Sequence, residues 1–189
     1  MLQKSADSTY PFTQDSNFWY LTGISEPNLI LVLDGSKEYI IAPEEDPVRS
    51  LFDGALDRES LAEQSGITQW YGHGEGWDRL NRRVKKVKHV ATLQPAPAYI
   101  ASIGMFTNPA RAGLVARVRE ANSDVELIDL RGQLATMRSV KQPEELDMMR
   151  RAIKQTARMF QIIEKRRGKV AHESELMAEL ERWRIKNGA

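Results

Sequence analysis

YPFTQDSNFWYLTG, residues 10–23, is the most aromatic stretch of the chain, with five aromatic side chains within eleven residues. Polar residues 13–17 interrupt it, and side chains of this kind favour turns because they hydrogen-bond to the local backbone. The apolar run of residues 29–33 follows soon after. We therefore predict an aromatic loop that enters a buried strand. Its aromatic side chains face either a neighbouring domain or subunit, or the core of the same domain.

The residues that follow predict a hairpin and further strands. Residues 29–33 are a continuous apolar run, which is typical of a strand covered on both faces. Asp34-Gly35 and the apolar residues 39–42 come next, and this order favours an antiparallel hairpin with a tight turn. Short strands are also predicted at residues 67–71, 90–93, 98–103 and 125–128.

Helices are predicted between these strands from capping residues and apolar spacing. The glycine-rich residues 72–76 are interpreted as a loose connection. Strands that alternate with helices predict an α/β domain in residues 1–130, with a mixed β-sheet flanked by helices. The predicted helices run from Asp46-Pro47 to Gly54, from the cap Asp57 to Gly66, along the apolar face of Trp77, Leu80, Val84 and Val87, and from Asn108-Pro109 through Leu114, Val115 and Val118.

Residues 131–189 have only helical patterns and form a second predicted part of the chain. Pro143 in the first turn, with two acidic residues after it, is a good helix start. A two-helix appendage of this size cannot bury both of its apolar stripes, so we expect something else to cover them and expect the chain to be cut short. The stripes are Leu146, Met149, Ile153, Phe160 and Ile163 in the first helix, and Leu176, Leu180 and Trp183 in the second.

Composition narrows the functional class. The 189 residues contain no cysteine, which excludes disulfides and thiolate metal ligands, and no apolar run approaches a membrane span. The N-terminus lacks the apolar core of a signal peptide, so we expect a cytoplasmic protein without a membrane partner. Residues 131–189 hold 14 Lys and Arg against 8 Asp and Glu, a net +6, whereas residues 1–130 carry a net −5. This asymmetry indicates two separate units.

No catalytic or metal-binding residues are predicted. The three histidines are scattered and lack metal-ligand spacing, and adjacent glutamates do not share one face of a helix. Neither a nucleophile elbow nor a phosphate-binding loop is present. The densest basic run, residues 82–88, has valines at core spacing and is interpreted as a solvated helix face. Binding of nucleic acid through residues 79–88 is the weakest of our hypotheses, and we predict none.

The chain resembles the N-terminal domain of aminopeptidase P, the Xaa-Pro aminopeptidase relative of prolidase and creatinase. The resemblance lies in two blocks of sequence. The second block, IDLRGQLATMRSVKQPEELDMMRRA at residues 128–152, resembles the junction between that family's N-terminal and catalytic domains. The first block begins with the aromatic stretch, and its matching positions are Tyr10, Pro11, Phe12, Gln14, Ser16, Phe18, Tyr20, Thr22, Gly23, Glu26 and Pro27.

The resemblance implies a non-catalytic part of a metallopeptidase that removes a residue preceding proline. Family members bind two divalent ions, usually manganese, in a C-terminal domain of pita-bread fold, where the ions generate a hydroxide. All five metal ligands of the family would lie beyond the sequence, so we expect no cofactor and no activity in this chain alone. Residues 131–189 would be the linker and first two helices of that domain. Proline-containing peptides would bind only with the catalytic domain.

The expected role is assembly of a homo-oligomer and shaping of the substrate entrance. Leu51 would stand where family members often carry a tryptophan that reaches toward a neighbouring subunit. Two alternatives stay open: the N-terminal portion of a Xaa-Pro dipeptidase, or a stand-alone protein-association module. The predicted interface residues are Tyr10, Phe12, Phe18, Trp19, Tyr20, Leu51 and Phe52.

Overall fold

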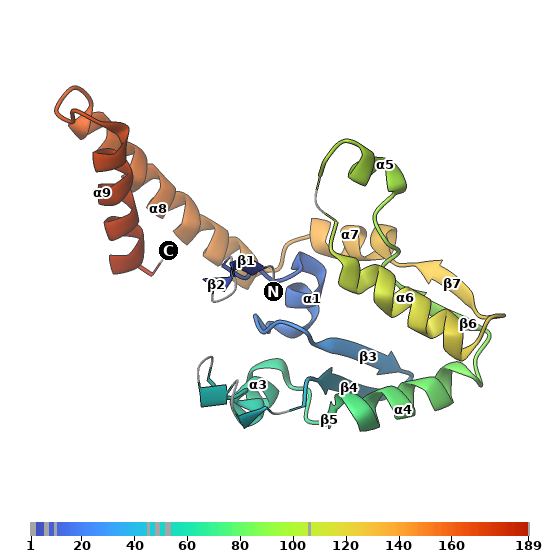
Figure 1. Ribbon diagram of the computed structural model, residues 1–189. Coiled ribbons are helices and arrows are strands. Elements are labelled where there is room, and N and C mark those ends of the chain that lie inside the picture. Colours follow the sequence, from blue (N-terminus) through green and yellow to red (C-terminus); the bar gives the residue numbers. More distant parts are fainter. Residues whose placement is uncertain are drawn as a thin grey trace. The chain divides into compact units, whose positions relative to one another are not determined.

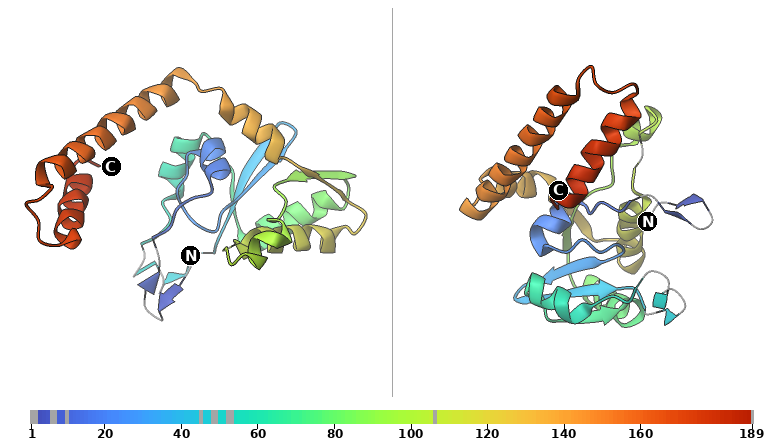
Figure 2. Two further views of the ribbon diagram at one scale, coloured as in Figure 1. Left: turned by 90° about the horizontal axis from the view of Figure 1, so that it is seen from above. Right: turned by 90° about the vertical axis from the view of Figure 1, so that its left-hand side faces the viewer.

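A computed structural model describes residues 3–5, 8–9, 11–44, 46–47, 50–51, 54–105 and 107–188 (Figures 1 and 2). The chain divides into two compact units, residues 1–136 and residues 137–189. The sequence analysis divides the chain at residues 130/131 into an α/β domain and the first helices of a catalytic domain. These two assignments stay predictions. The first unit has strands β1 (Gln3–Ser5), β2 (Ser8–Thr9), β3 (Ile30–Asp34), β4 (Lys37–Ala42), β5 (Trp70–Gly72), β6 (His89–Thr92) and β7 (Glu126–Asp129).

The helices of the first unit lie between its strands. They are α1 (Ser16–Thr22), α3 (Arg58–Ser65), α4 (His73–Val84), α5 (Ala98–Ser102) and α6 (Pro109–Ala121), and α7 (Arg131–Ser139) crosses the division between the units. Two predicted helices are capped as expected. The Asp57 side chain accepts a hydrogen bond from the N–H of Ser60 at the start of α3, and Asn108 accepts one from Ala110 at the start of α6. The helix predicted from Asp46 lies partly outside the described residues.

The predicted hairpin supplies two strands of a three-stranded mixed sheet, in which β4 is the central strand. Strand β3 pairs antiparallel with β4, and β4 pairs parallel with β5. Leu31 stands opposite Ile40, whose N–H donates instead to the carbonyl oxygen of Gln69 at 2.9 Å. The prediction that residues 29–33 are covered on both faces is wrong at the end of this run, because Leu33 is 61% exposed.

Strands β6 and β7 pair parallel in a separate two-stranded sheet, and β1 pairs with β2 (Figure 1). Residues 98–103, predicted as a strand, are mostly helix α5 instead. Ser102 there donates its hydroxyl hydrogen to the carbonyl oxygen of Tyr99, a bond that suits a helical turn.

The core forms where β4 packs against α4 and α6. Ile40 and Ile41 are completely buried on opposite faces of β4, and Trp77, Val84 and Val118 pack with Ile41 in one cluster. The loop predicted at residues 72–76 is wrong, because α4 begins at His73. A close contact explains the glycine in its first turn: a Cβ added at Gly76 would lie 2.6 Å from Cγ2 of Ile41. Packing of the helix onto the strand therefore overrides the weak helix propensity of glycine.

The second unit is a pair of helices, α8 (Pro143–Arg166) and α9 (Glu173–Lys186). Helix α8 begins at Pro143, as the sequence predicts, and a capping box of Gln142 and Glu145, which was not predicted, precedes its first turn. Neither helix contains a buried residue, although Arg166 of α8 and Glu179 of α9 form an ion pair at 2.6 Å. The apolar stripe of α8 is exposed to solvent at Ile153, which is 64% exposed.

The observed mixture of helices and a small mixed sheet confirms the predicted α/β fold class. Among the described residues, none of the helices combines the length and the apolar character that a bilayer crossing would require.

Candidate interaction surface

The aromatic segment, residues 11–23, contains a capped helix rather than the predicted loop. One carboxylate oxygen of Asp15 accepts hydrogen bonds from the N–H groups of Asn17 at 2.9 Å and Phe18 at 3.2 Å, which caps α1. Gly23 ends the helix at φ +70°, a backbone conformation that glycine adopts without strain. The segment therefore has defined ends at Asp15 and Gly23.

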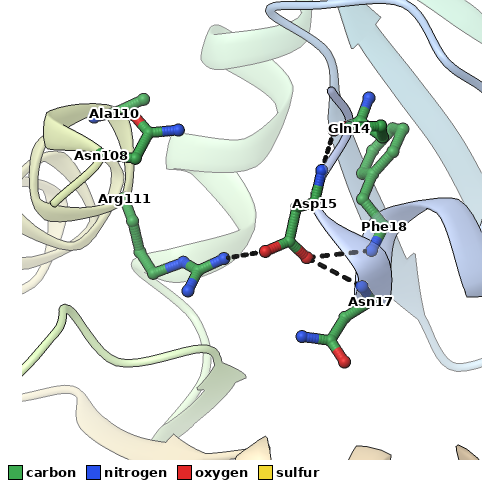
Figure 3. A network of polar contacts seen from close by, with 7 residues as sticks. All are labelled: Gln14, Asp15, Asn17, Phe18, Asn108, Ala110 and Arg111. Atoms are coloured by element: carbon green, nitrogen blue, oxygen red, sulfur yellow. Dashed lines mark hydrogen bonds and ion pairs between the residues drawn. The ribbon is translucent and has the colours of Figure 1, made fainter. Parts of the chain in front are cut away.

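An ion pair connects α1 to helix α6 of the first unit, which is far away in the sequence. Figure 3 shows the other carboxylate oxygen of Asp15 accepting a hydrogen bond from Nη2 of Arg111, in α6, at 2.8 Å. Partial burial by itself would raise the pKa of Asp15, but the hydrogen bonds from Arg111, Phe18 and Asn17 outweigh it and hold the pKa below its usual value. Asp15 is therefore a charged acceptor at neutral pH.

Two amide side chains fix the ends of the segment further. Gln14 donates from Nε2 to the carbonyl oxygen of Glu26 at 2.7 Å, and Gln64 of α3 donates to that of Gly23 at 2.6 Å. Ile24, directly after the segment, is completely buried. Bonds to α6, to α3 and to the loop at Glu26 thus position the aromatic side chains of α1.

The predicted interface residues differ in exposure. Trp19 is 56% exposed and Phe12 is 39% exposed, whereas Phe18 and Tyr20 are half-buried. Leu51 is 81% exposed, and Tyr10 and Phe52 lie outside the described residues. The role of this set as an interface stays a prediction.

A groove of about 1060 Å³ lies within the first unit, and its lining includes every residue of β3 and every residue of β6. Leu80 and Val84 of α4, with Leu114 and Val118 of α6, contribute apolar lining, and the aromatic segment contributes Phe12, Phe18 and Leu21. The groove is therefore mostly apolar and runs along two sheet edges. Sequence periodicity could not reveal it, because it forms between strands that are far apart in the chain.

The charged side chains that line the groove, and the one histidine there, already have partners within the protein. Besides the Asp15–Arg111 pair, Arg83 contacts Asp34 at 2.7 Å, and Nε2 of His89 lies 3.1 Å from a carboxylate oxygen of Glu126. The hydrogen bond and the charge of Asp34 raise the pKa of Arg83. These pairs leave the groove suited to an uncharged occupant.

Within the described ranges, no three His, Asp or Glu side chains are placed to hold a metal ion. His73 opens α4, His89 pairs with Glu126, and His172 precedes α9. These residues do not fit the pair of divalent ions that the resemblance implies, so no step of metal chemistry is assigned to them. The basic run at residues 82–88 is helical only as far as Val84, and most of its side chains are exposed.

Sequence reasoning missed the contribution of Arg111 and Gln64. The N-cap Asp15 and the terminal Gly23 could have revealed α1, because they bracket a segment of helical length. Nothing local could have revealed Arg111, which is 96 residues from its partner Asp15.

Comparison with known proteins gives matches to one family. Residues 2–91 match the family model described as the aminopeptidase P N-terminal domain. A Xaa-Pro aminopeptidase of Escherichia coli strain K12 is 31% identical, and one of Haemophilus influenzae is 29% identical, each over 82% of this chain. Those alignments cover 36% and 34% of the two relatives, so the chain spans about a third of their length.

The fold agrees with this match over the whole chain. The low-pH structure of Escherichia coli aminopeptidase P superposes with a TM-score of 0.77 and 26% identity, covering 100% of this chain and 44% of that one. Matched regions of sequence and fold thus coincide with the aromatic segment, the hairpin and the helices described above. Residues 2–91 of this chain thus match the N-terminal domain of the aminopeptidase P family, and the likeness in fold extends over the rest of the chain.

Proposed function

We propose that this chain is the non-catalytic N-terminal portion of a Xaa-Pro aminopeptidase, and that it assembles oligomers and shapes the substrate entrance. The observation that carries the proposal is an exposed aromatic side chain, Trp19, on a helix whose position is fixed by hydrogen bonds and an ion pair. Trp19 projects from α1, whose ends are tied by Asp15 and by Gln64. Large aromatic side chains held in one position are typical of protein interfaces, because little conformational entropy is lost on binding.

The names of the relatives support an aminopeptidase rather than a dipeptidase. The curated relatives from Escherichia coli, Haemophilus influenzae, human and mouse are all called Xaa-Pro aminopeptidase or Xaa-Pro aminopeptidase 3. The reacting centre, with two divalent ions that we expect to be manganese, would belong to the part of the parent protein outside these residues. Proline-containing peptides would bind there.

The proposal that these residues do not catalyse predicts no turnover by the chain alone. The purified chain is incubated with the tripeptide Ala-Pro-Ala and manganese, and released alanine is measured. We expect no release above that of the metal alone, because the described residues offer no donor set for the ions. Release that requires both the chain and manganese would overturn the non-catalytic assignment.

The assembly role is tested separately by light scattering. Over about a hundredfold range of concentration, we expect the apparent mass to rise above the 21.5 kDa of one chain. Trp19→Asp should lower the association, because it places a charge on the aromatic surface. Tyr99→Asp is the matched control, since Tyr99 of α5 is 62% exposed but distant in sequence from α1. A constant mass of one chain, or equal effects of the two variants, would contradict the assembly role.

A further inference from the structure

A pocket of about 230 Å³ lies within the second unit, between α8 and α9, which run side by side (Figures 1 and 2). Its lining residues on α8 follow the i, i+3, i+4, i+7 spacing of one helix face. From α9 come Trp183 and the C-cap Asn187. The pocket therefore joins one face of α8 to the C-terminal end of α9. Its lining residues are Arg151, Lys154, Gln155, Arg158, Trp183 and Asn187.

The three cations of this pocket have no acidic partner among the described residues. Arg151 and Lys154 are three positions apart, and Lys154 and Arg158 are four apart. Like charges at these spacings on a helix repel one another. An anion placed among them would relieve this repulsion, so the pocket favours a negatively charged occupant. The ion pairs of α8 and α9 use other residues: Arg150 with Asp147, Arg166 with Glu179, and Arg184 with Glu181.

Two uncharged side chains restrict the occupant further. The half-buried Trp183 offers a flat apolar surface on which a ring can stack. Nε2 of Gln155 donates to the carbonyl oxygen of Asn187 at 3.4 Å, but its Oε1 is buried and has no hydrogen-bond partner in the described part of the chain. A buried acceptor without a partner is unfavourable. The occupant should therefore carry a hydrogen-bond donor as well as a ring and a negative charge.

We propose that this pocket binds a nucleoside monophosphate whose base bears an amino group. The phosphate would lie against Arg151, Lys154 and Arg158, with the base stacked on Trp183 and its amino group donating to Oε1 of Gln155. The pocket is smaller than the roughly 300–1,000 Å³ of sites for drug-sized ligands, which suits one base with one phosphate. All of these residues belong to the second unit, so the proposal does not depend on the aminopeptidase assignment.

Simpler anions satisfy only part of this lining. Inorganic phosphate would meet the cations but would leave the indole of Trp183 and the acceptor of Gln155 unused. An acidic side chain of a peptide would do the same, because a carboxylate has neither a ring nor a donor. The combination of ring, donor and dianion is what points to a nucleotide.

Calorimetric titration of the full chain with adenosine 5′-monophosphate tests the proposal. At about 20 mM salt, where screening is weak, we expect a dissociation constant below about 1 mM. Adenosine lacks the phosphate and inorganic phosphate lacks the base, so each should bind roughly tenfold more weakly or worse. In the amide spectrum, the indole N–H signal of Trp183 should shift with the nucleotide and remain unchanged with inorganic phosphate.

Matched substitutions locate the site. Lys154→Gln should weaken nucleotide binding roughly fivefold or more, because it removes one charged contact to the phosphate. Lys165→Gln is the control, since Lys165 is an exposed lysine of the same helix that does not line the pocket. It changes the net charge equally and should alter binding by less than about twofold. Trp183→Leu should weaken binding roughly tenfold through lost stacking.

Three outcomes would overturn the proposal. The first is absence of binding at about 10 mM nucleotide, far above the expected dissociation constant. The second is equal affinity for inorganic phosphate and the nucleotide, which would mark a site for simple anions only. The third is equal weakening by Lys154→Gln and Lys165→Gln, because attraction to the helix as a whole would then explain the binding. If Trp183→Leu unfolds the helix pair, the indole signal of the unsubstituted chain still decides whether the base stacks there.

Discussion

The two units of this chain differ in how their helices are held. In the first, strand β4 is enclosed on both faces, and every apolar side chain that is buried among the described residues lies in residues 1–136. In the second, α8 and α9 contain no fully buried residue; each begins with a capping box, and an ion pair between Arg166 and Glu179 joins them. An ion pair of this kind contributes only about 0.2–1 kcal/mol. The comparison shows that two helices with regular apolar stripes can pair without forming a buried core of their own.

The largest expected effect tests this contrast with one substitution in each unit. Ile41→Ala should lower the free energy of unfolding by about 2–5 kcal/mol, because it opens a cavity beside Trp77 and Val84. Ile153→Ala, at an open position of α8, should change it by no more than about 0.5 kcal/mol. Urea unfolding followed by circular dichroism measures both. Equal losses would show that the apolar stripe of α8 is covered in solution, and the contrast would fail.

A glycine substitution sharpens the contrast between core contact and open surface. Gly76→Ala should destabilise the chain by about 1–3 kcal/mol, because the new Cβ would lie 2.6 Å from Cγ2 of Ile41. Gly113→Ala in α6 is the control, since no atom lies within 4 Å of its added Cβ. There the better helix propensity of alanine should stabilise by about 0.5–1 kcal/mol. Thermal unfolding gives the sign of each change, and stabilisation by Gly76→Ala would refute the close packing.

The smallest expected effect concerns the Asp15–Arg111 pair, which joins elements distant in sequence. Asp15→Asn keeps a good helix cap but loses the charge, so at neutral pH it should cost about 0.5 kcal/mol after allowance for solvent screening. Asp15→Ala also loses the cap and should cost about 1 kcal/mol more. Chemical unfolding of both variants, compared with the unsubstituted chain, measures these differences.

The pH dependence of the same pair has a defined sign. Because the folded pKa of Asp15 lies below its value in the unfolded chain, about 3.9, the stabilisation is complete above that pH. It is lost as the pH falls through the folded pKa. The stabilities of the unsubstituted chain and of Asp15→Asn should therefore converge in acid, and a constant difference between them would exclude the ion pair as its cause.

The sequence predicted most elements whose determinants are local. The hairpin followed from residues 29–33 and 39–42 with Asp34-Gly35 between them, and α3 followed from its caps at Asp57 and Gly66. The starts of α6 and α8 were signalled by Asn108-Pro109 and by residues 142–145. In each case the signal and the structure it specifies lie within a few residues, so pattern and capping chemistry suffice.

The missed elements depend on contacts between distant residues. Residues 73–76 form the first turn of α4 because Gly76 admits Ile41 of β4, and α1 is fastened by Arg111, which no local pattern connects to Asp15. The exposed Leu33 likewise reflects the free edge of β3, which the apolar run itself could not indicate.

By itself, the sequence determined the α/β class, the hairpin, the capped helices and the resemblance to the family, because these depend on patterns among residues close together in the chain. Only the tertiary structure decided which strand edges stay unpaired, where the groove lies and which aromatic side chains reach its lining. The physical reason is that backbone hydrogen bonds between strands and the burial of side chains depend on neighbours far along the chain, whose positions are set by packing of the whole unit.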